Sequence, residues 1–223
     1  MSFSANTRTV VFGGTSGIGR AVADALESRP GTVLQASRST GLDVSDINAV
    51  KAWFEQHGPV DHIIFTAGSQ APGGAVKDLD LEAARAAFDI KFWGAIGVAQ
   101  VAASYLRPHG TLTLTSGFLA RRTVPGTFVK TAINAALEAS VKLLARELAP
   151  LRVNIVSPGL TDTEAYSGMS EVARSQMLES TAARLPAGRV AQPEDVAAGY
   201  LFVIDTPSVT GAVIDIDGGA LVN

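Results

Sequence analysis

The sequence predicts an α/β protein with a doubly wound parallel sheet of about six strands, and three observations carry this prediction. Short apolar or β-branched runs alternate with longer helical stretches throughout the 223 residues. Such runs are typical of strands covered on both faces, and their alternation with helices predicts parallel pairing. The first run leads into a glycine-rich turn, and the link after the second run is unusually short.

Each element is expected from its own pattern. The six strand-like runs cover residues 9–12, 32–36, 63–66, 111–115, 153–156 and 213–216. The helical stretches cover residues 17–28, 46–57, 80–106, 128–149, 162–182 and 193–204. No linker or low-complexity break separates them, so residues 1–223 are expected to form one domain.

The connection after the second strand is too short for another crossover. Four residues separate Arg38 from Asp43, and a helix is expected to begin near Asp46. A parallel neighbour needs a crossover of about a dozen residues or more. The usual third strand and its crossover helix are therefore predicted to be missing, which leaves strand 32–36 exposed or covered only by a loop.

The amino-acid composition limits the partners, metal sites and cellular locations to be expected. The net charge of −3 offers no electrostatic reason to expect nucleic acid or an anionic membrane as a partner. The absence of cysteine excludes disulfides and thiolate metal sites, and the three scattered histidines lack metal-ligand spacing. The start of the chain lacks a signal-peptide pattern, and no apolar run has bilayer length, so a cytoplasmic protein is expected.

The first turn has the features of a phosphate-binding site. Gly13, Gly17 and Gly19 follow a buried strand and open an amphipathic helix. Glycines let the backbone approach a pyrophosphate closely, and the free N–H groups of the helix then point at the anion. The alternative is a glycine-rich turn without a ligand.

Over essentially its whole length, the chain resembles the short-chain dehydrogenase/reductase family. The matching segments are the glycine-rich turn 13–19 with Phe12 in place of the family's threonine, Asp43-Val44, Thr66-Ala67-Gly68, the Pro-Gly segment 158–163, and Asp217-Gly218-Gly219. The resemblance implies a Rossmann-like fold that binds a nicotinamide dinucleotide. The cofactor-binding residues that it implies are Gly13, Thr15, Ser16, Gly17, Ile18, Gly19, Ser37, Arg38, Asp43, Val44, Ala67, Gly68, Lys130, Pro158, Gly159, Leu160 and Thr163.

The end of the second strand predicts NADP(H) as the cofactor. An acidic residue there would bind the ribose 2′-hydroxyl and repel a 2′-phosphate. This chain instead has Ser37 and Arg38, with no carboxylate before Asp43. A guanidinium can grip the 2′-phosphate, and Ser37 and Ser39 can add hydroxyl donors. The alternative is that Arg38 only stacks on adenine or faces solvent.

The catalytic set departs from the family's Asn, Ser, Tyr and Lys. Ser116 fits the serine, and Lys130 at the start of a helix fits the lysine. Gly126 stands four residues before Lys130, where the tyrosine of Tyr-x-x-x-Lys belongs, and Lys91 occupies the asparagine position. The resemblance therefore transfers the fold and the cofactor, but not an intact mechanism.

Two residues are candidates for the missing acid. Tyr166 lies in the stretch that forms the family's mobile lid, where it either donates a proton or lines the substrate pocket. Lys91 either shares the cleft with Lys130, which would lower one pKa toward neutrality, or only fills the asparagine's volume. Arg121 and Arg122 either attract an anionic substrate or are solvated.

These residues predict an NADPH-dependent reductase of a small carbonyl or related unsaturated substrate. The alternative is a nucleotide-binding protein without redox turnover, such as a sensor or partner subunit. A third reading is a crippled variant whose parent carried a hydroxyl at Phe128. Helices 80–106 and 128–149 are apolar nearly all round, so we expect them to form a homodimer or homotetramer interface unless their own chain buries them.

Overall fold

The computed structural model describes residues 3–68 and 70–222. Within them, six parallel strands form one sheet in the order β2-β1-β3-β4-β5-β6, which confirms the predicted fold class. The strands are β1 (Arg8–Phe12), β2 (Thr32–Ala36), β3 (Val60–Phe65), β4 (Leu106–Thr115), β5 (Arg152–Pro158) and β6 (Val213–Ile216). β4 begins at Leu106, earlier than the predicted strand 111–115. The prediction missed the first half of β4 because it contains Pro108 and Gly110, residues that ordinarily argue against a strand.

The predicted loss of one strand is confirmed. After β2 the chain makes a 3₁₀ turn at Arg38–Thr40 and enters α2 (Ile47–His57). The next strand, β3, pairs with the opposite side of β1, so β2 remains at the edge of the sheet. The chain thus reverses its direction across the sheet between β2 and β3, which opens a crevice at the carboxyl ends of β1 and β3.

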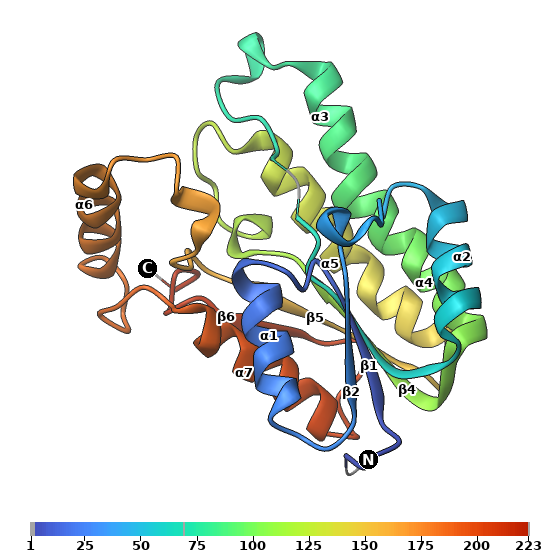
Figure 1. Ribbon diagram of the computed structural model, residues 1–223. Coiled ribbons are helices and arrows are strands. Elements are labelled where there is room, and N and C mark those ends of the chain that lie inside the picture. The colour runs from blue at the N-terminus through green and yellow to red at the C-terminus, as the bar shows by residue number, and fades with distance from the viewer. Residues whose placement is uncertain (1–2, 69, 223) are drawn as a thin grey trace.

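Helices cover both faces of the sheet (Figure 1). On one face lie α1 (Gly17–Glu27) and α7 (Pro193–Asp205), which enclose a core that includes Val11 and Tyr200. On the other lie α2, α4 (Gly94–Tyr105) and α5 (Phe128–Glu147), around a core that includes Phe12 and Phe65. Neighbouring residues of β1 thus point to opposite cores, as strand geometry requires.

Two of the predicted helices, 80–106 and 162–182, are not continuous α-helices in the structure. The stretch 80–106 contains α3 (Leu81–Phe88), a π-helical turn at Asp89–Trp93, and α4. The predicted helix 162–182 is wrong in its first half. A 3₁₀ turn at Glu164–Tyr166 comes first, and α6 (Glu171–Ala182) begins only after Ser170, whose hydroxyl caps it by accepting the N–H of Ala173.

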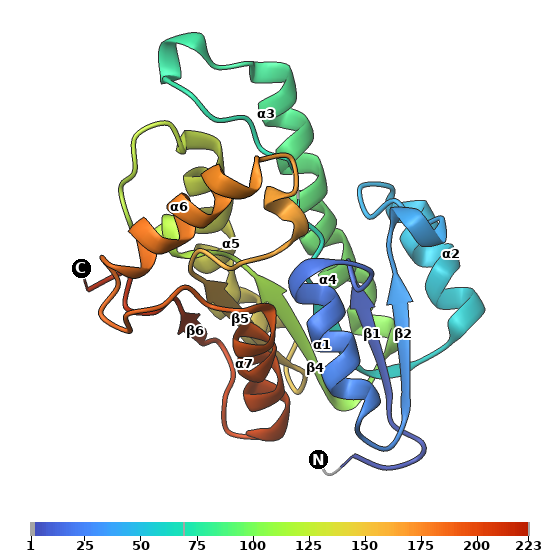
Figure 2. The same ribbon diagram turned by 60° about the vertical axis from the view of Figure 1, so that its left-hand side comes forward.

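The elements that frame the crevice lie at one end of the molecule. Figure 2 shows α3 and α6 beyond the carboxyl edge of the sheet, while the N-terminus lies at the opposite edge. Among the residues described, no helix combines the length and apolar character that crossing a membrane requires.

Candidate active site

The crevice between β1 and β3 holds a cavity of about 550 Å³. It is lined by Gly13, Thr15, Ser16, Gly17, Ile18, Gly19, Ser37, Arg38, Ser39, Leu42, Asp43, Val44, Thr66, Ala67, Gly68, Gln70, Ile90, Thr163, Glu164 and Ala165. Most of the residues expected to bind the cofactor are therefore brought together here. Sequence reasoning named Ser39 as a hydroxyl donor and Thr66 as part of a matching segment, but it missed five other lining residues: Leu42, Gln70, Ile90, Glu164 and Ala165.

Two glycines of the glycine-rich turn, Gly13 and Gly19, are packed so tightly that neither position has room for a side chain. A Cβ on Gly19 would lie 2.2 Å from the carbonyl oxygen of Gly13, and one on Gly13 would lie 2.7 Å from the backbone N of Ala67. Gly13 also has a φ of 85°, a conformation that favours glycine. The start of α1 already attracts an anion, because the carboxylate of Glu164 accepts the N–H of Gly17 at 2.9 Å. This part of the cleft fits a dinucleotide's diphosphate.

Hydroxyl groups gather at the other end of the cleft. The hydroxyl of Thr15 donates to Ser37 at 3.0 Å, Ser37 and Ser39 lie 2.7 Å apart, and Ser39 donates to Thr15 at 3.1 Å. The exposed side chain of Arg38 borders this cluster. Asp43 accepts hydrogen bonds from the hydroxyl and N–H of Ser45, which lower the pKa of Asp43. Hydroxyls and a guanidinium at this end suit a ribose phosphate.

Four predicted cofactor-binding residues do not line this cavity: Lys130, Pro158, Gly159 and Leu160. Leu160 packs against a small cluster formed by Leu185, Val190 and Ala220. A Cβ on Gly159 would lie 2.7 Å from Cα of Asp217, so this glycine permits the two backbones to meet. Asp217 in turn accepts the N–H groups of Gly219 and Leu221 and holds the C-terminal turn.

Lys91 lies in the π-helical turn, and its ammonium is buried between that turn and α5. It donates to Oδ1 of Asn134 at 2.7 Å and to the carbonyl oxygen of Ser116 at 3.0 Å. Burial, and next the positive charge of Lys130, lower the pKa of Lys91 to about 8. The two ammonium groups therefore interact electrostatically, as the sequence suggested.

Lys130 does not enter this buried cluster. Its side chain is exposed, one helical turn before Asn134, which is buried. Lys130 and Asn134 lie four residues apart on α5, so both side chains are on the same face of the helix. Sequence reasoning missed Asn134. The helical spacing of Lys130, Asn134 and Glu138 was the signal that could have found it.

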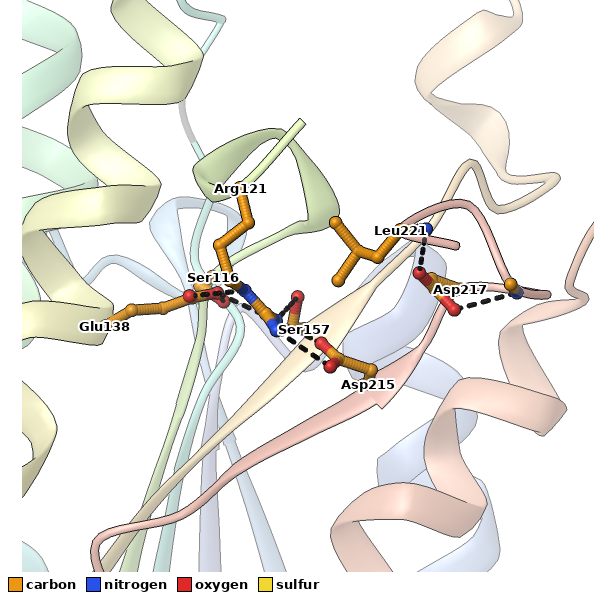
Figure 3. Close-up of polar contacts among 8 residues, drawn as sticks. Ser116, Arg121, Glu138, Ser157, Asp215, Asp217 and Leu221 are labelled. Atoms are coloured by element: carbon orange, nitrogen blue, oxygen red, sulfur yellow. Dashed lines mark hydrogen bonds and ion pairs between the residues drawn. The ribbon is translucent and has the colours of Figure 1, made fainter. Parts of the chain in front are cut away.

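Ser116 is buried, and its hydroxyl donates to Oε1 of Glu138 at 2.8 Å. Nε of Arg121 lies 2.9 Å from Oε2 of the same carboxylate, and its guanidinium also pairs with Asp215. Figure 3 shows Arg121 between the two carboxylates, near Ser157 of β5. Arg121 is therefore neither simply solvated nor available as an unpaired cation for an anionic substrate. Arg122 donates to the carbonyl oxygen of Ala220.

The three tyrosines occupy different environments. Tyr200 is fully buried and hydrogen-bonds to Thr115 at 2.6 Å, and Tyr105 stacks on Phe54 at the end of α4. Tyr166 is partly buried in the turn before α6, where burial, and next the charge of Asp162, raise its pKa. A raised pKa makes Tyr166 a weaker acid at neutral pH. No cluster of three potential metal ligands occurs in the described part of the chain.

The parallel sheet, the crevice where it reverses and the glycine-rich anion site together define a dinucleotide-binding protein of the Rossmann type. Comparisons with known proteins agree with this class. A family model described as enoyl-(acyl carrier protein) reductase matches residues 32–220. The chain belongs to the short-chain dehydrogenase/reductase family of oxidoreductases.

Individual relatives cover different shares of the chain. The short-chain dehydrogenase/reductase ATR9 of Stachybotrys chlorohalonatus is 34% identical, over 73% of this chain and 64% of its own length. The relative ucsE of Acremonium sp is 30% identical, over 96% of this chain and 94% of its own length. A small-chain dehydrogenase crystallised with NADPH is 53% identical with a TM-score of 0.95, covering 98% of this chain and 100% of the other.

Proposed function

We propose that this protein is an NADPH-dependent reductase of a small carbonyl or related unsaturated substrate. The observation that carries the proposal is the buried ammonium of Lys91, with its lowered pKa, beside Ser116. The hydroxyl cluster at Thr15, Ser37 and Ser39 with Arg38 supports NADPH over NADH. The similarity to a dehydrogenase crystallised with NADPH supports the same cofactor. When bound, the nicotinamide supplies the hydride.

In this proposal, Lys91 provides the proton. An ammonium has three N–H donors, and two of those of Lys91 are used by Asn134 and Ser116. The third remains for the substrate oxygen or for a water molecule that relays the proton. A pKa near 8 leaves most of the ammonium protonated at pH 7, yet ready to give up its proton.

Ser116 and Lys130 support this transfer in different ways. The hydroxyl of Ser116 donates its one hydrogen to Glu138. The oxygen of Ser116 can therefore only accept a further hydrogen bond, and it can position a water molecule or a substrate hydroxyl in that way. Lys130 stabilises negative charge on the substrate oxygen and keeps the pKa of Lys91 low. Tyr166, whose pKa is raised, lines the substrate pocket from the lid.

The test replaces Lys91 with methionine, which retains the stem and removes the charge. Lys91→Met should lower NADPH-dependent turnover of a responsive carbonyl by about 100- to 1,000-fold, as expected for loss of a preorganised donor. NADPH affinity should change little, because Lys91 does not line the cofactor cavity. Lys142→Met, on the exposed part of α5, is the matched control and should retain activity.

Two results would contradict the proposal. Full turnover in Lys91→Met would remove Lys91 from the chemistry. A wild-type protein that binds NADPH but oxidises it with no carbonyl, imine or enone would instead favour a nucleotide-binding role without turnover.

We also propose that the protein assembles as a homodimer, or as a homotetramer, through α4 and α5. Trp93, at the start of α4, is 59% exposed, and Leu143 of α5 is 57% exposed. Large apolar side chains on neighbouring helices suit contact with a second copy.

A further inference from the structure

We propose that Glu164 lowers the affinity of the cleft for NADPH, because its carboxylate occupies the place at the start of α1 that the diphosphate of NADPH needs. This inference rests on the cofactor named in the proposed function. It concerns binding of that cofactor and is independent of whether catalysis follows.

Contacts at the beginning of α1 support this assignment. Ser16 stands at the N-cap, but its side chain makes no capping hydrogen bond. The N–H of Gly17 is instead satisfied by Oε2 of Glu164 at 2.9 Å, across 147 residues of sequence. Oε1 of Glu164 lies 3.7 Å from the guanidinium of Arg20. A carboxylate of the chain therefore fills an anion site that the glycine-rich turn creates.

The carboxylate is held in its charged form. A hydrogen bond with its own backbone N–H, and then that from Gly17, lower the pKa of Glu164, and the charges of Arg20 and Arg174 act in the same direction. An ionised carboxylate is attracted by the same helix dipole and N–H groups that attract phosphate. Glu164 thus resembles the cofactor's diphosphate in charge and in hydrogen-bonding capacity.

The two anions compete for this place. The N–H of Gly17 has one hydrogen, and two negative groups within a few ångströms of each other repel. Glu164 lies on the 3₁₀ turn Glu164–Tyr166, which Thr163 caps by accepting the N–H of Ala165. Cofactor binding is therefore expected to displace this turn, which also carries Tyr166.

The test compares ligands that contain a diphosphate with one that does not. Glu164→Gln should lower the Kd for NADPH by about 2- to 5-fold, the range expected for an exposed anion at a helix N-terminus. Inorganic pyrophosphate should bind more tightly by a similar factor. Adenosine 2′-monophosphate, which reaches only the hydroxyl cluster, should bind with unchanged affinity. NADPH fluorescence and calorimetry provide these values without any turnover assay.

Two further variants serve as controls. Glu194→Gln removes a negative charge from the neighbouring groove, which Gly17 and Arg20 also line, while leaving the contact between Glu164 and Gly17 in place. It should change the NADPH Kd by less than 2-fold. Arg38→Ala should weaken binding of both adenosine 2′-monophosphate and NADPH. Circular dichroism and Tm establish that each variant is folded, and Glu164→Ala provides a second substitution with the same expected direction.

An unchanged or higher NADPH Kd in both Glu164 variants would overturn the inference. Equal tightening in Glu164→Gln and Glu194→Gln would also overturn it, because the effect would then be a general loss of negative charge. A protein that binds NADPH but reduces nothing would refute the proposed reductase and leave this inference intact.

Discussion

The ammonium of Lys91 is buried, and burial disfavours its charged form. The ammonium is stabilised by two oxygen acceptors, on Asn134 and Ser116, and destabilised by desolvation and by Lys130. The balance lowers the pKa to about 8, which is the property a proton donor needs near neutral pH. A lysine with this pKa can take over a proton transfer that the family assigns to tyrosine.

The first prediction follows from the coupling between the two lysines. In the wild type, the rate should fall as the pH rises through about 8, because Lys91 loses its proton. Lys130→Met removes a positive charge that lowers the pKa of Lys91, so this fall should move to higher pH. Lys130→Met should also cost about 2.7–4 kcal/mol of transition-state stabilisation. The pH profile of kcat/KM measures both effects.

A readout independent of turnover separates the alternatives. The ¹³Cε chemical shift of Lys91, followed against pH in labelled protein, should titrate at higher pH in Lys130→Met than in the wild type. Lys142→Met should leave that titration unchanged. Identical Lys91 titrations in wild type and Lys130→Met would show that the two charges are not coupled.

At the scale of elements, a buried histidine joins two central strands. His62 of β3 hydrogen-bonds through Nδ1 to the hydroxyl of Thr111 on β4 at 2.9 Å. Only 3% of His62 is exposed, and burial lowers its pKa from 6.5 to about 4. Between pH 6.5 and about 4, the folded protein therefore keeps this imidazole neutral, whereas the unfolded chain would protonate it.

The second prediction concerns stability in acid. As the pH falls from 6.5 to 4, the unfolded chain binds a proton at His62 that the folded chain does not bind. The contribution of His62 to stability is thus present above pH 6.5 and is lost toward pH 4, by up to about 3 kcal/mol. Urea unfolding at pH 7.5 and 4.5 should show a smaller loss of stability for His62→Gln than for wild type. Equal losses in the two proteins would contradict this assignment.

At the scale of the whole molecule, the sheet separates binding from assembly. The cleft opens at the carboxyl edge, at the reversal between β1 and β3, whereas α4 and α5 present side chains such as Leu143 away from the sheet. An oligomer formed through these helices would leave the cofactor entrance at the carboxyl edge.

The third prediction tests that assembly. Leu143→Glu places a charge on the apolar surface that α5 contributes to the proposed interface, so the protein should become monomeric at micromolar concentration. Light scattering gives the mass directly. Val172→Glu, on the exposed surface of α6 where Val172 is 67% exposed, should keep the wild-type mass. A wild-type protein that is already monomeric would contradict the proposed dimer.

The sequence by itself determined the parallel sheet, the missing strand and the glycine-rich anion site. Each depends on local pattern: apolar periodicity, the four residues between Arg38 and Asp43, and three closely spaced glycines between a strand and a helix. The predicted helix 162–182 was too long, because Ser167 and Gly168 interrupt the stretch and Ser170 caps a new helix that begins after it.

Only the tertiary structure decided the chemistry of the cleft. Lys91 meets Asn134 across 43 residues, Ser116 meets Glu138 across 22, and Glu164 meets Gly17 across 147. Such pairings depend on how the helices and loops pack against the sheet, and a single sequence contains no local signal for them. Lys130 and Asn134 lie one turn apart on the same face of α5, and packing decides which of the two lies at the level of Lys91 along the helix.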